Sequence, residues 1–167
     1  ITFADINNDY LPEIIVPISQ QLIVVKSNGL YQFLPQTAIL GVVKAHGSVA
    51  ADINDDGIVD IITVMKMNDG SGIIYAWYFD HNDQEHVVPG YPIILPFAPT
   101  TMLTVGDVNG DGELELLGGY TTGEFPVTGS GVYIIDPPGE LFASKQAVEW
   151  STYGGDLRNT HCYKCSI

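Results

Sequence analysis

Within the segment ADINDDGIVDIITV (residues 51–64), four carboxylates surround a single glycine, and an apolar run follows directly. Related copies are ADINNDYLPEIIV (residues 4–16) and GDVNGDGELELLGG (residues 106–119). The leading aspartates Asp5, Asp52 and Asp107 are 47 and 55 residues apart, so the repeat length is about 50 residues. A period of this size is typical of solenoids and propellers.

Each copy follows the pattern D-x-N-x-D-G-x-x-[DE], with one change in the first. Oxygen-bearing side chains at alternate positions of a tight loop can face one hard cation, and the glycine permits the bend, as in calcium-binding loops. Positions 1, 3, 5 and 9 would supply side-chain ligands, and position 7 a backbone carbonyl. The predicted Ca²⁺ ligands, in up to three sites, are Asp5, Asn7, Asp9, Leu11 and Glu13; Asp52, Asn54, Asp56, Ile58 and Asp60; and Asp107, Asn109, Asp111, Glu113 and Glu115.

Three other interpretations of these loops are less favourable. An EF-hand needs a Glu at position 12, where this chain has Val16, Thr63 and Gly118, and the β-branched flanks favour strands over helices. Magnesium takes few protein ligands and keeps its waters. Plain turns also contain Asp, Asn and Gly, but three copies with an acid at position 9 favour calcium. In the first loop Tyr10 replaces the glycine and is expected to need a left-handed backbone.

The charge balance excludes some partners. The net charge is −14 with only six Lys and Arg residues, which disfavours binding to nucleic acid or anionic membranes through a basic patch. More than half of the 20 acidic residues lie in the three loops. No apolar run reaches the roughly 20 residues of a membrane span, so we expect no membrane insertion. The chain opens without the basic start of a signal peptide, as a fragment or a processed chain would.

Turn residues divide each repeat into about four short strands rich in Val, Ile and Tyr. Four antiparallel strands per repeat are typical of a β-propeller blade. We therefore predict an all-β fold of three four-stranded blades, at about residues 1–46, 47–101 and 102–149, with a closing segment or tail at residues 150–167. The fourth strand of the third blade is expected within residues 140–150. Since propellers usually have at least four blades, the blades should belong to a larger propeller, be completed by other copies, or stack openly.

The three loops and their flanking strands resemble the FG-GAP repeats of integrin-α-type β-propellers and of related secreted microbial proteins. Two further segments, at residues 72–93 and 150–163, are similar to stretches of the secreted branch. The resemblance implies calcium in the loop between the first and second strands of each blade. Tyr10 departs from the family pattern. The FG and GAP signatures are weak, which favours the microbial branch over the integrin branch.

Catalytic motifs are not evident in the sequence. The histidines are scattered, and neither a G-x-S-x-G elbow nor a phosphate loop occurs. The carboxylates could form a glycosidase pair, but bound calcium would keep them ionised. An aromatic cluster is expected to pack in the core, with a sugar-stacking platform as the alternative. The histidines are His46, His81, His86 and His161, and the aromatic cluster is Tyr75, Trp77, Tyr78 and Phe79.

We expect a non-catalytic, calcium-stabilised extracellular module for adhesion or for binding a protein or carbohydrate ligand. The alternatives are the propeller portion of a secreted polysaccharide-active enzyme, or a filament or surface subunit that self-associates through open blade edges. Extracellular calcium modules have dissociation constants of roughly 0.1–1 mM, which the cytosol cannot saturate. In the tail, Cys162 and Cys165 are expected to form a disulfide or to be inert, with a metal or redox role left open, and Asp156 and Arg158 are expected to pair.

Overall fold

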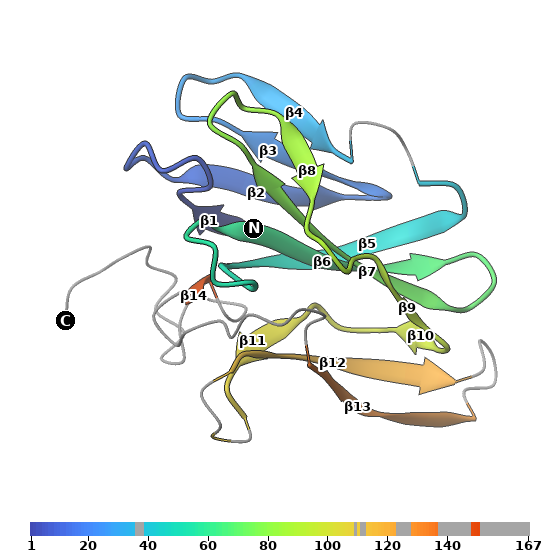
Figure 1. Cartoon of the computed structure of the whole chain (residues 1–167). Coiled ribbons are helices and arrows are strands. Elements are labelled where there is room, and N and C mark those ends of the chain that lie inside the picture. Colours follow the sequence, from blue (N-terminus) through green and yellow to red (C-terminus); the bar gives the residue numbers. More distant parts are fainter. Residues whose placement is uncertain (36–38, 109, 111–112, 123–127, 137–147, 151–167) are drawn as a thin grey trace.

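The computed structural model describes residues 1–35, 39–108, 110, 113–122, 128–136 and 148–150, and these residues form antiparallel β-sheets (Figure 1). The first sheet runs in chain order through β1 (Thr2–Ala4), β2 (Glu13–Ile18), β3 (Gln21–Val25) and β4 (Tyr31–Leu34). Each of these strands pairs with the next along the chain. The first repeat therefore forms a complete four-stranded meander.

The second sheet is the largest and lies between the other two. Its strands are β5 (Val42–Ala51), β6 (Asp60–Met67), β7 (Gly72–Phe79), β8 (Glu85–Val87), β9 (Ile93–Leu95) and β14 (Val148–Trp150). β8 pairs with the end of β7 and β9 with its beginning. Since β6 occupies the other edge of β7, β8 and β9 together fill the place of a fourth strand.

The third sheet contains β10 (Ala98–Pro99), β11 (Thr104–Gly106), β12 (Glu115–Thr122) and β13 (Gly129–Ile135). β13 pairs with residues 116–122 of β12, and β10 and β11 share the opposite edge. Together these two short strands occupy the place that β5 holds in the second sheet. The turn residues between them interrupt what is a single ten-residue strand in the second repeat.

The predicted all-β fold of antiparallel, blade-like sheets is confirmed. The strands of the second and third sheets begin at Val42 and Ala98, a few residues before the blade boundaries expected at 47 and 102. The prediction that residues 140–150 form the last strand of the third blade is wrong for residues 148–150, and residues 140–147 lie outside the described part of the chain. Val148 and Trp150 pair instead with Ala51 and Ala50 of β5, where an open strand edge offers backbone groups for pairing.

The three sheets pack through two hydrophobic cores, one between each pair of neighbouring sheets. The core between the first and second sheets includes Ile15, Leu22 and Trp77, and the core between the second and third includes Ile62 and Leu116. Alternation along the strands supplies both cores, because neighbouring residues of a strand point to opposite faces. Each large aliphatic side chain that is fully buried contributes roughly 1.5–3 kcal/mol.

The aromatic cluster is divided between the two cores: Trp77, Phe79 and Tyr75 belong to the first, whereas Tyr78 packs against the second. Trp77 and Phe79 are 0 % and 2 % exposed, and the ring of Tyr75 stacks on Trp77 with 5.1 Å between centroids. A sugar-stacking platform needs exposed ring faces, so the platform interpretation is wrong for Trp77 and Phe79.

Among the described residues there is no helix of the length and hydropathy that a membrane span requires.

Candidate metal-binding loops

All three acidic loops occupy the same place in their sheets. The first joins β1 to β2, the second joins β5 to β6 and the third joins β11 to β12. In each, the position 1 aspartate follows the first strand directly and the position 9 acid opens the second. The strand flanks confirm that these loops are not EF-hands, which lie between helices.

In the second loop the backbone wraps around the carboxylates. The N–H groups of Asp56 and Gly57 donate to the two oxygens of Asp52 at 3.0 and 2.7 Å. The N–H of Ile58 donates to Asp56 Oδ1 at 2.8 Å, and the Asn54 amide donates to Asp56 Oδ2 at 2.9 Å. These bonds hold positions 1, 3 and 5 on the inner side of one turn.

The first loop repeats this pattern at equivalent atoms. The N–H groups of Asp9 and Tyr10 donate to Asp5 at 3.0 and 2.8 Å, and the N–H of Leu11 donates to Asp9 at 2.8 Å. The Asn7 amide donates to Asp9 at 3.3 Å. Two loops 47 residues apart therefore adopt one conformation, which is stronger evidence for a shared role than their sequence similarity alone.

The bend requires left-handed backbone at two positions. Position 4 has a positive φ in all three loops, with 60° at Asn8, 56° at Asp55 and 85° at Gly110. Position 6 has a φ of 85° at Gly57 and 69° at Tyr10. The strain expected at Tyr10 is therefore present, because a side chain in this region costs on the order of 1 kcal/mol.

The position 9 acids are the most buried members of the loops. Glu13 and Asp60 are both 0 % exposed. One oxygen of each accepts a backbone N–H, from Ile6 at 3.2 Å and from Ile53 at 2.9 Å. The other oxygens, Glu13 Oε1 and Asp60 Oδ1, are buried without a hydrogen-bond partner. A buried carboxylate oxygen without a partner is costly and requires an explanation.

The electrostatics of these acids indicate crowded negative charge. Burial raises the pKa of Asp60 from 3.8 to about 8, against the Ile53 hydrogen bond and with the added charges of Asp56 and Asp52. Burial likewise raises the pKa of Glu13 to about 6. The pKa of Asp52 is raised as well, chiefly by burial. Each of these carboxylates would be stabilised as an anion by a nearby cation.

The third loop is described in part. The N–H of Val108 donates to Glu115 at 2.7 Å, which matches the bonds of Ile6 and Ile53, and Glu115 is 2 % exposed. The N–H of Gly110 donates to Asp107 at 2.6 Å. The predicted ligands Asn109 and Asp111 lie outside the described residues, as do His161 and the tail residues 151–167.

The donor set suits a hard cation, although the residues that the structure describes form no ready-made metal centre. In the described part of the chain, no group of three or more His, Cys, Asp and Glu side chains is arranged to hold a metal ion. Several loop oxygens accept backbone N–H groups instead. Aspartate, asparagine and carbonyl oxygens are nevertheless the ligands that calcium prefers, and the unpartnered oxygens of Glu13 and Asp60 would be satisfied by such an ion.

Sequence reasoning missed the backbone donors at position 2. In each loop the backbone N–H of this residue donates to one oxygen of the position 9 acid, which lies seven residues further along the chain. The donors are Ile6, Ile53 and Val108. An apolar residue follows the first aspartate in every copy, and this was the available signal. Its side chain anchors the loop in two copies, because Ile6 and Ile53 are 2 % and 3 % exposed.

Four-stranded antiparallel sheets are the units of a β-propeller, and here each sheet carries an acidic loop in the connection before its second strand position. Residues 52–118 match the family model of the FG-GAP-like repeat. The match begins at the first aspartate of the second loop and ends in β12, so it includes the second and third loops. The chain therefore contains an FG-GAP-like repeat, a kind of repeat that commonly binds calcium. Comparisons with curated proteins and with solved structures gave no match.

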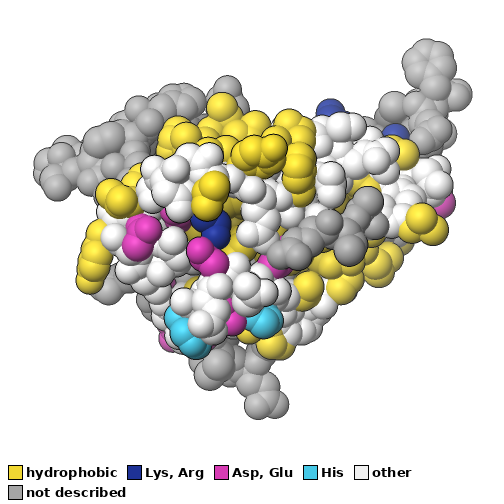
Figure 2. All heavy atoms as spheres, turned by 90° about the horizontal axis from the view of Figure 1, so that it is seen from above, with side chains coloured by type: hydrophobic (Ala, Val, Ile, Leu, Met, Phe, Trp, Pro, Cys, Tyr) yellow, Lys and Arg dark blue, Asp and Glu magenta, His cyan; other side chains and the backbone are white. Residues whose placement is uncertain are grey.

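The histidines that the structure describes have local partners or are buried. His86 Nε2 lies 3.1 Å from Asp80 Oδ2, and its ring stacks on Tyr78. In Figure 2, which views the molecule from above, histidine side chains lie beside acidic ones. Burial lowers the pKa of His46, which lies on β5.

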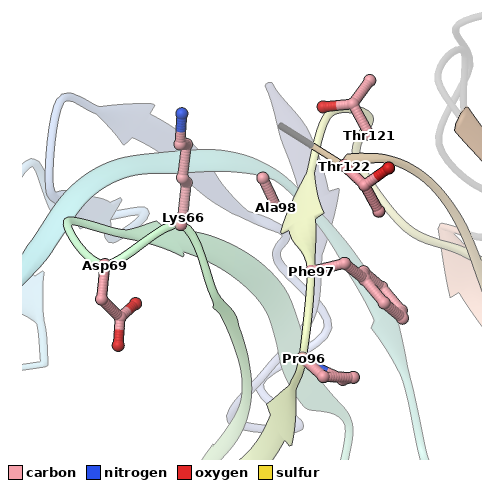
Figure 3. Close-up of a pocket in the computed structure, with 8 residues that line it drawn as sticks. Lys66, Asp69, Pro96, Phe97, Ala98, Thr121 and Thr122 are labelled. Atoms are coloured by element: carbon pink, nitrogen blue, oxygen red, sulfur yellow. The ribbon is translucent and has the colours of Figure 1, made fainter. Parts of the chain in front are cut away.

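A pocket of about 270 Å³ lies at the ends of β6 and β12 that are distant from the loops (Figure 3). Sequence reasoning did not predict it. The side chains of Lys66 and Asp69 point away from each other in Figure 3, so they do not converge on one ligand. The lining residues are Lys66, Asp69, Gly70, Pro96, Phe97, Ala98, Thr121 and Thr122.

The strain at position 6 gives a testable difference between the loops. The change Tyr10→Gly is expected to raise the free energy of unfolding by about 1 kcal/mol, because glycine adopts a φ of 69° without a Cβ clash. The Tyr10 ring is 92 % exposed, so little packing is lost. Urea unfolding would measure the effect. Tyr10→Ala, which loses the ring but keeps Cβ, is the control, and an equal gain in both variants would contradict the explanation.

Proposed function

We propose that this chain is a non-catalytic, calcium-stabilised propeller-type module that works outside the cell and binds a protein or carbohydrate ligand. The observation that carries the proposal is the repeated, buried position 9 acid. Glu13 and Asp60 each keep one oxygen without a partner, in loops whose remaining oxygens come from aspartate and asparagine. A cation in each loop would compensate this buried charge.

The ion would act as a cross-link between strands. Position 1 stands at the end of the first strand and position 9 at the start of the second, so ligands from both would tie the two strands together. Calcium supplies a charge of +2 and a flexible coordination shell of oxygens. In the second loop Asp52, Asn54, Asp56 and Asp60 would hold it with the carbonyl of Ile58. The hydrogen bond from Asn54 to Asp56 would give way to shared coordination.

The proposed calcium sites also support an extracellular setting. Loops of this kind in extracellular modules bind calcium with dissociation constants of roughly 0.1–1 mM, and only extracellular calcium saturates them. The partner would bind away from the loops, whose oxygens are used for the ion. The net charge of −14 favours partners other than nucleic acid or anionic lipid surfaces. Assignment of the repeats to the secreted microbial branch is part of this proposal.

Counting bound ions tests the ligand assignment. Isothermal titration with calcium should show that Asp56→Ala and Asp111→Ala each bind one ion fewer than the parent chain, because position 5 would supply a side-chain ligand. Asp55→Asn is a matched control: Asp55 is exposed in the same loop, is not a predicted ligand, and its φ of 56° suits asparagine. Ion counts equal to the parent in both alanine variants would refute the assignment.

A further inference from the structure

The outer faces of the first and third sheets are apolar. In the first sheet one row pairs Ile14, Val25 and Tyr31 and the next pairs Val16, Ile23 and Phe33. In the third sheet Leu117 pairs with Ile134, and Gly119 with Val132. Exposed fractions reach 67 % at Tyr31 and 72 % at Val132. Figure 2, which views the molecule from above, shows hydrophobic side chains gathered on that face, and patches of this kind mark interaction surfaces.

The two residues that follow each position 9 acid show why the outer faces of the first and third sheets are apolar. These pairs are Ile14 with Ile15, Ile61 with Ile62, and Leu116 with Leu117. Within each pair the side chains point to opposite faces of the sheet. Ile15 of the first pair and Ile61 of the second share one core, and Ile62 and Leu116 share the other. Each internal interface therefore joins the second member of one pair to the first member of the next.

Two members of these pairs have no such counterpart within the described sheets. Ile14 is a first member with no preceding sheet, and it is 36 % exposed. Leu117 is a second member with no following sheet, and its neighbour Ile134 is 56 % exposed. The outer faces of the first and third sheets are thus the two complementary halves of an interface that the chain already forms twice.

The side-chain sizes on these faces also match. In the first core, Trp77 and Phe79 of the second sheet pack with Leu22 and Val24 of the first. In the second core, Tyr120 and Tyr133 of the third sheet pack with Ile62 and Ile74 of the second. The largest buried rings of each core come from the later sheet, and the earlier sheet adds the partly buried rings of Phe3 in the first core and Tyr78 in the second. The outer faces keep this division, with Tyr31 and Phe33 on the first sheet and Val132 and Ile134 on the third.

We propose that two copies of this chain associate head to tail, with the outer face of the first sheet in one protomer packed on the outer face of the third sheet in its partner. Such a contact is heterologous, and two copies satisfy every face only when they close into a ring. Two copies of three sheets give six sheets, within the usual four to eight blades of a propeller. The association uses no loop residue and does not depend on the proposed calcium sites.

Sedimentation velocity of the whole chain over a wide concentration range tests this arrangement. The parent is expected to reach the mass of two chains and no more. Phe33→Lys on the first sheet and Ile134→Lys on the third should each weaken self-association at least about 10-fold, because each places a charge in a buried interface. Leu40→Lys is the matched control, since Leu40 is 95 % exposed in the turn before β5 and lies on neither face. Thermal melts of all variants verify folding.

Mixing the two face variants distinguishes head-to-tail pairing from face-to-itself pairing. The Phe33→Lys chain keeps an intact third sheet and the Ile134→Lys chain an intact first sheet, so an equimolar mixture should regain a two-chain species. Dimers of either variant alone would indicate a face that pairs with itself and would overturn the proposal. A parent chain that stays monomeric, or that grows into open-ended species, would also overturn it and would leave these faces to an additional repeat or another partner.

Discussion

Calcium at about 10 mM is expected to raise the melting temperature of the chelator-treated chain by roughly 6–20 °C. At a 10- to 100-fold excess over a dissociation constant of roughly 0.1–1 mM, each saturated site adds about 1.4–2.7 kcal/mol, and two sites add about 3–5 kcal/mol. For a domain of this size, each kcal/mol shifts the midpoint by roughly 2–4 °C. The physical source is the repulsion within the loops, where burial and neighbouring charges raise the pKa of Asp60 and of Glu13.

The control for this shift separates coordination from screening. A chain with a net charge of −14 is stabilised by any salt, so chelator, calcium and magnesium samples must be matched in ionic strength with sodium chloride. Calcium should stabilise far more than magnesium, which holds its waters and tolerates few protein ligands. Equal shifts with both ions, or no shift with calcium, would contradict the assignment of the loops as structural calcium sites.

The change Asp60→Asn is expected to have opposite effects in the two conditions. In chelator it should raise the free energy of unfolding by about 2–4 kcal/mol near neutral pH, because it removes a buried carboxylate whose pKa is shifted to about 8. The asparagine oxygen can still accept the N–H of Ile53. In calcium the same variant should lose the stabilisation that the second loop provides, because an anionic ligand is gone.

The pH dependence of this effect has a definite sign. The pKa of Asp60 is raised in the folded state, so the folded chain holds a proton that the unfolded chain releases between pH 3.8 and about 8. The stability of the calcium-free parent should therefore fall as the pH rises through this window, and Asp60→Asn should flatten the decline. Urea unfolding at several pH values measures both. Asp69→Asn is the control, because hydrogen bonds from Ser71 lower the pKa of this exposed acid. A gain in chelator with Asp69→Asn as large as with Asp60→Asn would refute the explanation.

The repeated loop allowed much of this architecture to be predicted from sequence. Alternating ligands, a glycine and an acid at position 9 placed the loops between strands, and the structure confirms this for all three. The prediction was poorer where turn residues interrupt a strand. Val88 to Pro92 separate β8 from β9, and Thr100 to Leu103 separate β10 from β11, yet both pairs still occupy single strand positions. Local turn propensity cannot show whether the chain returns to the same edge of the neighbouring strand after the turn.

Long-range pairing also escaped prediction. β14 joins β5, although nearly 100 residues separate them, because pairing depends on which edge is open and not on sequence distance. In the first and second loops, residue spacing predicted that positions 1, 3 and 5 lie together, and hydrogen bonds join these positions. It could not show that Glu13 and Asp60 are fully buried, since burial arises from the neighbouring sheets.

The adjacent residues Ile61 and Ile62 belong to different cores, so the middle sheet takes part in both packing interfaces while each outer sheet takes part in one. Disorder in the middle sheet removes both interfaces together. Opening of the first or the third sheet leaves one interface intact. In a single chain we therefore expect partial unfolding to begin at an outer sheet, and the amide hydrogens of the middle sheet to exchange last.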